Sequence, residues 1–196
     1  MRGATEGETT MAFIDTPSDP AFFDANRAPA GHVPNFVQTF AARQAVYDAW
    51  KQLNGAIKES MDLRRYELAT LAAATALRSS YCSLAHGQVL ADKFYTAEEV
   101  AALVDEPPNN PVDEAVMAFA RKVALGADKV TQEDVDGLKA LGLSDADVLD
   151  VVLAAAARAF FSKTLDATGT QPDSVFNNLP DTLRTALTVG RPIYSG

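Results

Sequence analysis

One cysteine and one histidine stand close together in the middle of the chain, and this pair is the clearest candidate for chemistry. Cys82 is the only cysteine among the 196 residues, and His86 follows it four positions later. On a helix, residues four apart lie one above the other on the same face, so the thiol and the imidazole can touch. A histidine can accept the thiol proton, and the thiolate attacks electrophiles and peroxides. The spacing therefore predicts a reactive-thiol site.

The segment that carries the pair, SSYCSLAHGQVLADKF, is predicted to be a helix that begins at its serines. Ser79 or Ser80 can accept backbone N–H bonds as the N-cap, which puts Cys82 in the first turn. The positive end of the helix dipole then also favours the thiolate. Glu67 lies on the preceding predicted helix, and an antiparallel return can bring its carboxylate beside His86. Glu67 would then hold the imidazole in one tautomer and complete a Glu-His-Cys relay.

The elements that would position this site are predicted to be helices. One of them carries an apolar stripe with spacings of four, three and four residues, formed by Val46, Trp50, Leu53 and Ile57. The run 62–78, DLRRYELATLAAATALR, contains no Gly or Pro and predicts a largely buried helix. The segment 147–161, DVLDVVLAAAARAFF, is apolar nearly all round, so other helices or another subunit must cover it.

Three more helix starts have a Ser or Thr three residues before an acidic residue: Thr96 with Glu99, Thr131 with Asp134, and Ser144 with Asp147. No segment predicts a strand. The sequence thus predicts an all-α multi-helix bundle, with residues 1–36 as an extended, proline-containing N-terminal arm and residues 37–196 as a single helical domain. The Ala-rich helices and their leftover apolar surface indicate a homo-oligomer.

Composition excludes several classes of function. Seventeen basic and 26 acidic residues give a net charge of −9, which repels phosphate backbones and anionic membrane surfaces, so neither nucleic acid nor a membrane is an expected partner. The start, MRGATEGETTMAF, lacks the apolar core of a signal peptide, and a free thiol suits a reducing compartment, so we expect a cytoplasmic protein. Only His32 could join Cys82 and His86 as a soft ligand, so neither a metal nor a cofactor is expected.

The stretch RRYELATLAAATALRSSYCSLAHG resembles the signature of the alkylhydroperoxidase D (AhpD) and carboxymuconolactone decarboxylase superfamily. In that signature a Glu is followed by eleven residues, then Cys-x-x-Cys, three residues and a His. Glu67, Cys82 and His86 match the Glu, the second Cys and the His. Two flanking positions also match, Tyr81 and Ala85. The resemblance extends over about residues 22–173. Within the superfamily, the sequence resembles the subgroup of uncharacterised peroxidase-related proteins.

The resemblance implies an AhpD-like helical bundle, built as dimers, trimers or hexamers, that acts as a thiol-dependent (alkyl)hydroperoxide reductase. It implies that Cys82 is the nucleophile, served by a His86/Glu67 proton relay. In relatives with both cysteines, the first resolves the sulfenic acid as an intramolecular disulfide, but here Ser79, beside Tyr81, replaces it. A peroxidase cycle would therefore need a small-molecule hydroperoxide and an external thiol reductant. Downstream, Phe-Ser-Lys at 161–163 stands where relatives commonly read Phe-Asn-Arg.

Two other functions compete with this interpretation. One is cofactor-free acid–base chemistry on a small organic acid, similar to the decarboxylase branch, with His86 and Glu67 moving protons. The arginines near the motif that could bind its carboxylate are Arg64, Arg65 and Arg78. The other is a degenerate helical scaffold that has lost efficient turnover together with its first cysteine.

Overall fold

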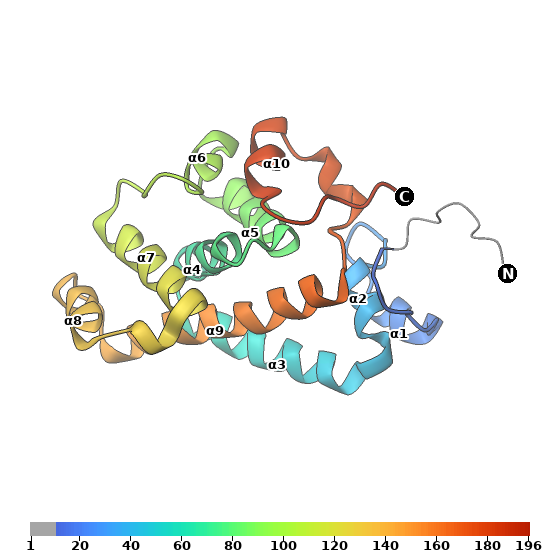
Figure 1. The fold of residues 1–196 in the computed structure, drawn as a ribbon, viewed down its shortest axis with the longest axis horizontal. Helices are drawn as coiled ribbons and strands as arrows, with labels where there is room; N and C mark the ends of the chain where they lie inside the picture. Colours follow the sequence, from blue (N-terminus) through green and yellow to red (C-terminus); the bar gives the residue numbers. More distant parts are fainter. Residues whose placement is uncertain (1–10) are drawn as a thin grey trace, which may run out of the picture.

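A computed structural model describes residues 11–196, which form helices joined by short loops (Figure 1). The α-helices are α1 (Pro20–Ala25), α2 (Asn35–Phe40), α3 (Gln44–Ser60), α4 (Leu63–Ala76), α5 (Ser80–Lys93), α6 (Ala97–Ala102), α7 (Pro111–Gly126), α8 (Gln132–Ala140), α9 (Asp145–Thr168) and α10 (Asp181–Leu187). Short 3₁₀ helices occupy Ala41–Arg43, Ala127–Lys129 and Ser174–Asn178. Residues 11–196 contain no strand, which confirms the predicted all-α class.

Helix α4 is the centre of the fold. All its residues from Tyr66 to Ala74 are buried, and α5, α7 and α9 pack against it, as the arrangement in Figure 1 shows. The alanines give α4 a strong helix propensity, and because their side chains are small, the neighbouring helices can approach α4 closely. The largely buried helix predicted over 62–78 is confirmed.

The turn between α4 and α5 places the cysteine. Arg78 adopts the left-handed conformation with a φ of 57°, which reverses the chain so that α5 begins at Ser80. Ser79 occupies the N-cap position, but its side chain makes no capping hydrogen bond. The hydroxyl of Ser80 instead accepts the backbone N–H of Gly190 at 2.7 Å, which ties the C-terminal tail to this turn. Cys82 lies in the first turn of α5, as predicted.

Helix α9 lies along one side of α4 and α3. It begins at Ser144, whose hydroxyl and the carboxylate of Asp147 form the predicted capping box. The other two predicted helix starts also have a capping box, formed by Thr96 with Glu99 and by Thr131 with Asp134. Gly169 ends α9 with a φ of 74°, a left-handed conformation that glycine adopts without a steric penalty.

The apolar stripe predicted on α3 is divided between the core and the surface. Trp50 and Ile57 are buried, whereas Val46 is 45% and Leu53 is 52% exposed. The reason is that the buried face of α3 is shifted by one residue from the predicted stripe, so that Tyr47 is buried in place of Val46. On α9 itself, three large apolar side chains are also exposed: Leu149, Leu153 and Phe160. Apolar surface therefore remains uncovered on these two helices.

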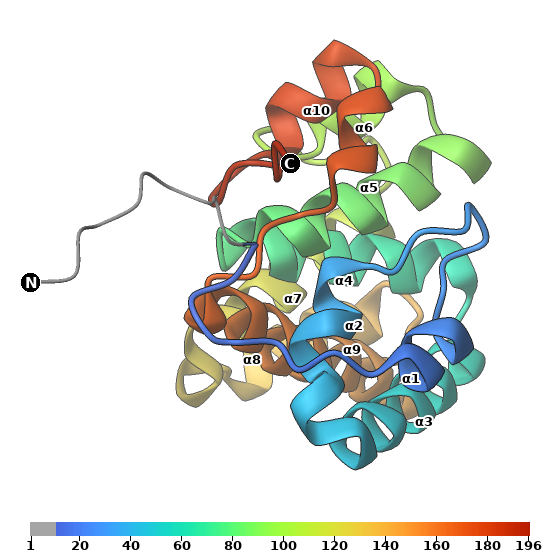
Figure 2. The ribbon, with the colours of Figure 1, turned by 90° about the vertical axis from the view of Figure 1, so that its right-hand side faces the viewer.

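The segment expected as an extended arm is partly helical in the region that the structure describes, and its residues 1–10 lie outside the described residues. Asp19 caps the short helix α1 by accepting the N–H of Phe22 at 3.0 Å. Upstream, the carbonyl of Met11 accepts from the N–H of Gln171 at 2.9 Å. Figure 2 shows this N-terminal segment, in blue, leading from beside the C-terminal end of α9 to α1.

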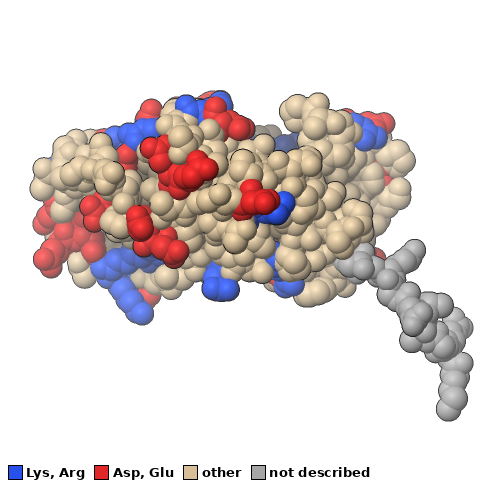
Figure 3. All heavy atoms as spheres, turned by 90° about the horizontal axis from the view of Figure 1, so that it is seen from above, with Lys and Arg blue, Asp and Glu red and all other residues tan. Residues whose placement is uncertain are grey.

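The surface carries charges of both signs. In the view of Figure 3, acidic and basic side chains are both scattered over the exposed face, with more acidic ones toward its left end. None of the helices formed by residues 11–196 is long and apolar enough to span a membrane.

Candidate active site

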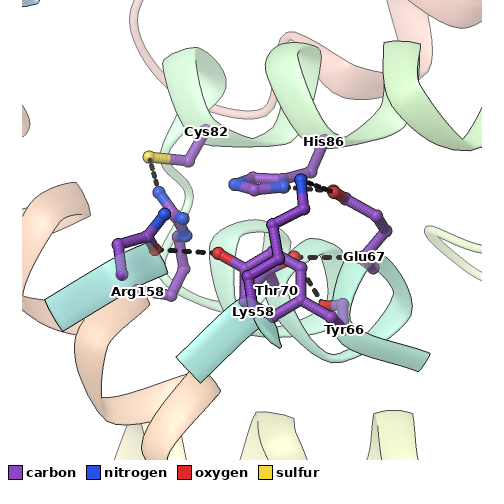
Figure 4. A network of polar contacts seen from close by, with 8 residues as sticks. Lys58, Tyr66, Glu67, Thr70, Cys82, His86 and Arg158 are labelled. Carbon is purple, nitrogen blue, oxygen red and sulfur yellow. Dashed lines mark hydrogen bonds and ion pairs between the residues drawn. The ribbon is translucent and has the colours of Figure 1, made fainter. Parts of the chain in front are cut away.

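Glu67 and His86 face each other across the α4–α5 hairpin (Figure 4). Nδ1 of His86 lies 2.5 Å from Oε2 of Glu67, whose side chain is 1% exposed. Lys58, near the end of α3, donates from Nζ to the other oxygen of Glu67, Oε1, at 3.0 Å. The carboxylate is therefore held through both oxygens. We call Lys58, Glu67 and His86 the relay.

The charges of the relay follow from these contacts. Burial alone would raise the pKa of Glu67, but the hydrogen bonds and charges of His86 and Lys58 outweigh it and lower that pKa. Burial, assisted by the charge of Arg158, lowers the pKa of His86 to about 4, although Glu67 opposes the shift. At neutral pH the relay thus contains a carboxylate and a neutral imidazole. A carboxylate only accepts hydrogen bonds, so we assign the ring proton to Nδ1, which leaves the lone pair on Nε2.

Cys82 lies on the other side of the imidazole. Figure 4 shows the ring of His86 between the carboxylate of Glu67 and the side chain of Cys82. The hydrogen bond that the sulfur accepts comes from Arg158, whose Nη1 is 3.5 Å away. Cys82, His86 and Arg158 all line one cavity of about 330 Å³, which we call the Cys82 pocket. The thiol, its candidate base and a guanidinium therefore meet at one space.

Arg158, from the middle of α9, is a site residue that the sequence analysis missed. Its side chain is buried, and its guanidinium carbon lies 5.9 Å from the ring centre of Trp50 and 5.7 Å from that of Phe161. Burial disfavours its charge, but contacts with Cys82 and Tyr66 hold the pKa of Arg158 above the ordinary value. The sequence contained one signal that could have identified Arg158, since it is the single charged residue in the apolar run AAAARAFF. Buried charges are rare unless they have a partner or a role.

The arginines that the sequence offered for a substrate carboxylate do not line the Cys82 pocket. Arg64 forms an ion pair with Asp113 of α7, and Arg65 lies 3.0 Å from Asp147 of α9. Arg78 belongs to the turn between α4 and α5. The side chains of Arg64 and Arg65 connect helices, whereas Arg158, the buried cation of the pocket, comes from a segment more distant in sequence.

Tyr81 and Ser79, the residues predicted beside the site, have different surroundings. The hydroxyl of Tyr81 donates to Asp173, which also accepts the N–H of Asn35 at 2.7 Å and lies 3.9 Å from His32. Burial and the negative charge of Asp173 raise the pKa of Tyr81 well above its usual value. Tyr81 lines the Cys82 pocket and anchors the N-terminal segment to α5, whereas Ser79 is fully buried in the turn and does not line the pocket.

The rest of the pocket wall is largely aromatic. Its aromatic side chains are Phe36, Tyr47, Trp50, Tyr81 and Phe161. Among residues 11–196, no group of three or more His, Cys, Asp or Glu side chains is placed to hold a metal ion. The pocket lining brings together a thiol, a neutral imidazole with the lone pair on Nε2, and the guanidinium of Arg158, and it also includes Lys51.

Solved structures with the same helical arrangement define the class of fold. An AhpD-core, uncharacterized peroxidase-related protein from Ralstonia eutropha JMP134 matches with a TM-score of 0.74 and 23% identity over 86% of this chain and 95% of its own. An uncharacterized peroxidase-related protein from Silicibacter sp. TM1040 matches with a TM-score of 0.76 and 18% identity, covering 90% and 98% of the two chains. The chain therefore has an AhpD-like fold.

A second comparison relates part of the sequence to a known family. Residues 44–122 match the model of the carboxymuconolactone decarboxylase family, and this region includes Glu67, Cys82 and His86. This part of the chain is similar to that family, as its motif predicts. Among curated proteins, none is detectably similar to this sequence.

A third solved structure shows another chemistry on the fold. It is the debrominase Bmp8 in complex with 2,3,4-tribromopyrrole, with a TM-score of 0.67 and 17% identity over 88% of this chain and 94% of its own. The fold alone therefore does not determine the reaction.

Proposed function

We propose that the protein is a thiol-dependent hydroperoxide reductase in which Cys82 is the nucleophile. The observation that carries the proposal is the convergence of Cys82, His86 and Arg158 on one pocket, with Glu67 behind the imidazole of His86. In this reaction Nε2 of His86 takes the proton of the thiol. Glu67 keeps the ring in the tautomer that has its lone pair on Nε2, and it stabilises the imidazolium that forms.

The oxidising step begins when the thiolate of Cys82 attacks the terminal oxygen of the hydroperoxide. The sulfur electron pair forms an S–O bond, the O–O bond breaks, and the departing alkoxide takes a proton from the imidazolium of His86. The net change is Cys–SH plus ROOH to Cys–SOH plus ROH. Arg158, whose Nη1 lies 3.5 Å from the sulfur, donates the hydrogen bond that the sulfur accepts.

The return to the thiol needs electrons from outside the chain. Because Cys82 is the only cysteine, no second thiol of the same molecule can form a disulfide with it. One external thiol would condense with the sulfenic acid and release water, and a second would reduce the mixed disulfide to regenerate Cys82. Excess peroxide would compete by oxidising the sulfenic acid to sulfinic acid.

The test is rapid mixing of the reduced protein with tert-butyl hydroperoxide, followed by mass spectrometry of the Cys82 peptide. We expect one added oxygen at equimolar peroxide and a thiol adduct when a small thiol is present. Cys82→Ser is the matched control for oxidation elsewhere. If neither product forms while iodoacetamide still labels Cys82, the proposal is wrong.

The second candidate is acid–base chemistry on a small organic acid, and the observation that favours it is Arg158, a guanidinium beside a neutral imidazole. His86 and Glu67 would move the protons, and Cys82 would be auxiliary. Cys82→Ser should then keep activity, whereas His86→Ala should lose it. The peroxidase proposal requires the opposite result for Cys82→Ser.

We also propose that the chain works in the cytoplasm as a homo-oligomer. The exposed apolar side chains of α9, together with Val46 and Leu53 of α3, provide surface that a second copy could bury. The mass in solution, measured by sedimentation equilibrium, tests this directly.

A further inference from the structure

The Cys82 pocket contains a buried positive charge without a negative partner. Arg158 is 4% exposed, and no carboxylate of residues 11–196 forms an ion pair with it. Nη1 contacts the sulfur of Cys82, a further hydrogen bond involves Tyr66, and Nε is buried with no hydrogen-bond partner. An unpaired buried cation costs several kcal/mol, so a bound anion would relieve a cost that the free protein carries.

The pocket as a whole favours an anion. Its lining contains Arg158 and Lys51 but no Asp or Glu. Lys51 lies 3.0 Å from the exposed Asp48, and His86 is neutral because burial lowers its pKa to about 4. Arg158 is therefore the uncompensated charge of the cavity, on a protein whose net charge is −9. The charge that lines the pocket is therefore opposite in sign to the net charge of the molecule.

The size and the walls of the pocket limit the anion to a small organic one. The cavity, about 330 Å³, is at the small end of the usual range for ligand sites, roughly 300–1,000 Å³. Its aromatic walls suit an apolar body. A guanidinium binds a carboxylate in a planar, two-point arrangement, which a thiol or a ring face cannot provide.

We propose that Arg158 binds the carboxylate of the substrate, and that the site acts on small organic hydroperoxides that carry a carboxylate. The reactive step rests on the proposed function, whereas binding of the carboxylate does not. Because Nη1 of Arg158 is 3.5 Å from the sulfur, the carboxylate and the peroxide must be only a few bonds apart. The thiolate forms an S–O bond, the O–O bond breaks, and a hydroxy acid leaves after taking the proton from His86.

The first arm of the experiment compares two peroxides that differ in one group. α-Hydroperoxyisobutyrate has a carboxylate where tert-butyl hydroperoxide has a methyl group. A charge-assisted hydrogen bond contributes about 1.5–3 kcal/mol, so we expect the native protein to favour the carboxylate by about 10- to 150-fold in kcat/KM. In Arg158→Gln this ratio should fall toward one, and in Arg158→Lys it should be intermediate. Arg65→Gln removes a positive charge outside the pocket and should keep the native ratio.

The second arm needs no peroxide. Phenylacetate, which has an apolar ring and a carboxylate, should slow the labelling of Cys82 by neutral iodoacetamide, and phenylacetamide at the same concentration should not. Arg158→Gln should lose the protection by phenylacetate, and Arg65→Gln should keep it. If Arg158→Gln does not fold, two measurements still test carboxylate binding. They are the protection in Arg158→Lys and the comparison of phenylacetate with phenylacetamide on the native protein.

The outcomes separate this inference from the proposed function. Protection by phenylacetate without any oxidation of Cys82 would support carboxylate binding and overturn the peroxidase. Equal protection by the acid and the amide would overturn carboxylate binding. An equal loss of rate for both peroxides in Arg158→Gln would mean that Arg158 acts on the thiolate alone, which also overturns the inference.

Discussion

Replacing Glu67 with glutamine is expected to reverse the tautomer of His86. The ammonium of Lys58 can only donate, so the amide oxygen of Glu67→Gln must face it, as Oε1 does now at 3.0 Å. The amide –NH₂ then faces Nδ1 of His86, which must accept instead of donate. The ring proton moves to Nε2, the nitrogen that the thiol proton would need.

The size of the effect follows from the cost of keeping the original tautomer. That tautomer would turn the amide –NH₂ toward Lys58 and leave a donor in a largely buried site without its acceptor. Such a loss costs about 1–3 kcal/mol, which reduces the active tautomer by about 5- to 150-fold. We expect the rate of Cys82 oxidation by tert-butyl hydroperoxide to fall by the same factor.

The decisive comparison adds Lys58→Met to Glu67→Gln. Without the ammonium the amide can rotate and accept from Nδ1–H, so the double variant should be faster than the single one. Lys58→Met alone keeps the Glu67 carboxylate and is the control. The assay is rapid mixing with mass spectrometry of Cys82, together with nitrogen NMR of the imidazole, which reports the protonated nitrogen. Native-like oxidation in Glu67→Gln, or no recovery in the double variant, would refute the tautomer argument.

Three further predictions concern stability and assembly. The pKa of His86 is about 4 in the folded protein and roughly 6.5 in the unfolded chain. The unfolded chain therefore binds the extra proton, and stability falls as the pH drops from about 6.5 through about 4. Urea unfolding should show that the free energy of unfolding falls by about 2–3 kcal/mol over this range, and His86→Gln should lack that loss. Gly169→Ala places a Cβ on a residue with a φ of 74° and against the ring of Phe13, so the free energy of unfolding should drop by about 1–2 kcal/mol. Gly137→Ala, in open space on α8, should raise the free energy of unfolding by roughly 0.5–1 kcal/mol. An equal effect at both positions would contradict the conformational argument. Leu149→Glu with Leu153→Glu should shift the mass in sedimentation equilibrium toward the monomer, and Val175→Glu, also exposed but outside α9, should not.

The sequence by itself determined the features that depend on neighbours along the chain. The three capping pairs, the buried α4 and the place of Cys82 in the first turn of α5 all follow from helix periodicity and from the hydrogen bonds of helix ends. The contact between Glu67 and His86 belongs to the same group. The two residues are 19 positions apart on adjacent helices of one hairpin, so the spacing of the motif almost fixes their meeting.

Only the tertiary structure decided which distant side chains complete the site. Arg158 meets Cys82 across 76 positions of sequence, because α9 happens to turn that one residue toward α5 while Leu149 and Phe160 point outward. Lys58 reaches Glu67 from the exposed end of α3. The rotation and register of one helix on another are set by the packing of many side chains at once, and no local pattern encodes them. Cys82, His86 and Glu67 were therefore visible in the sequence, whereas the contact of Lys58 and the buried positive charge of Arg158 were not.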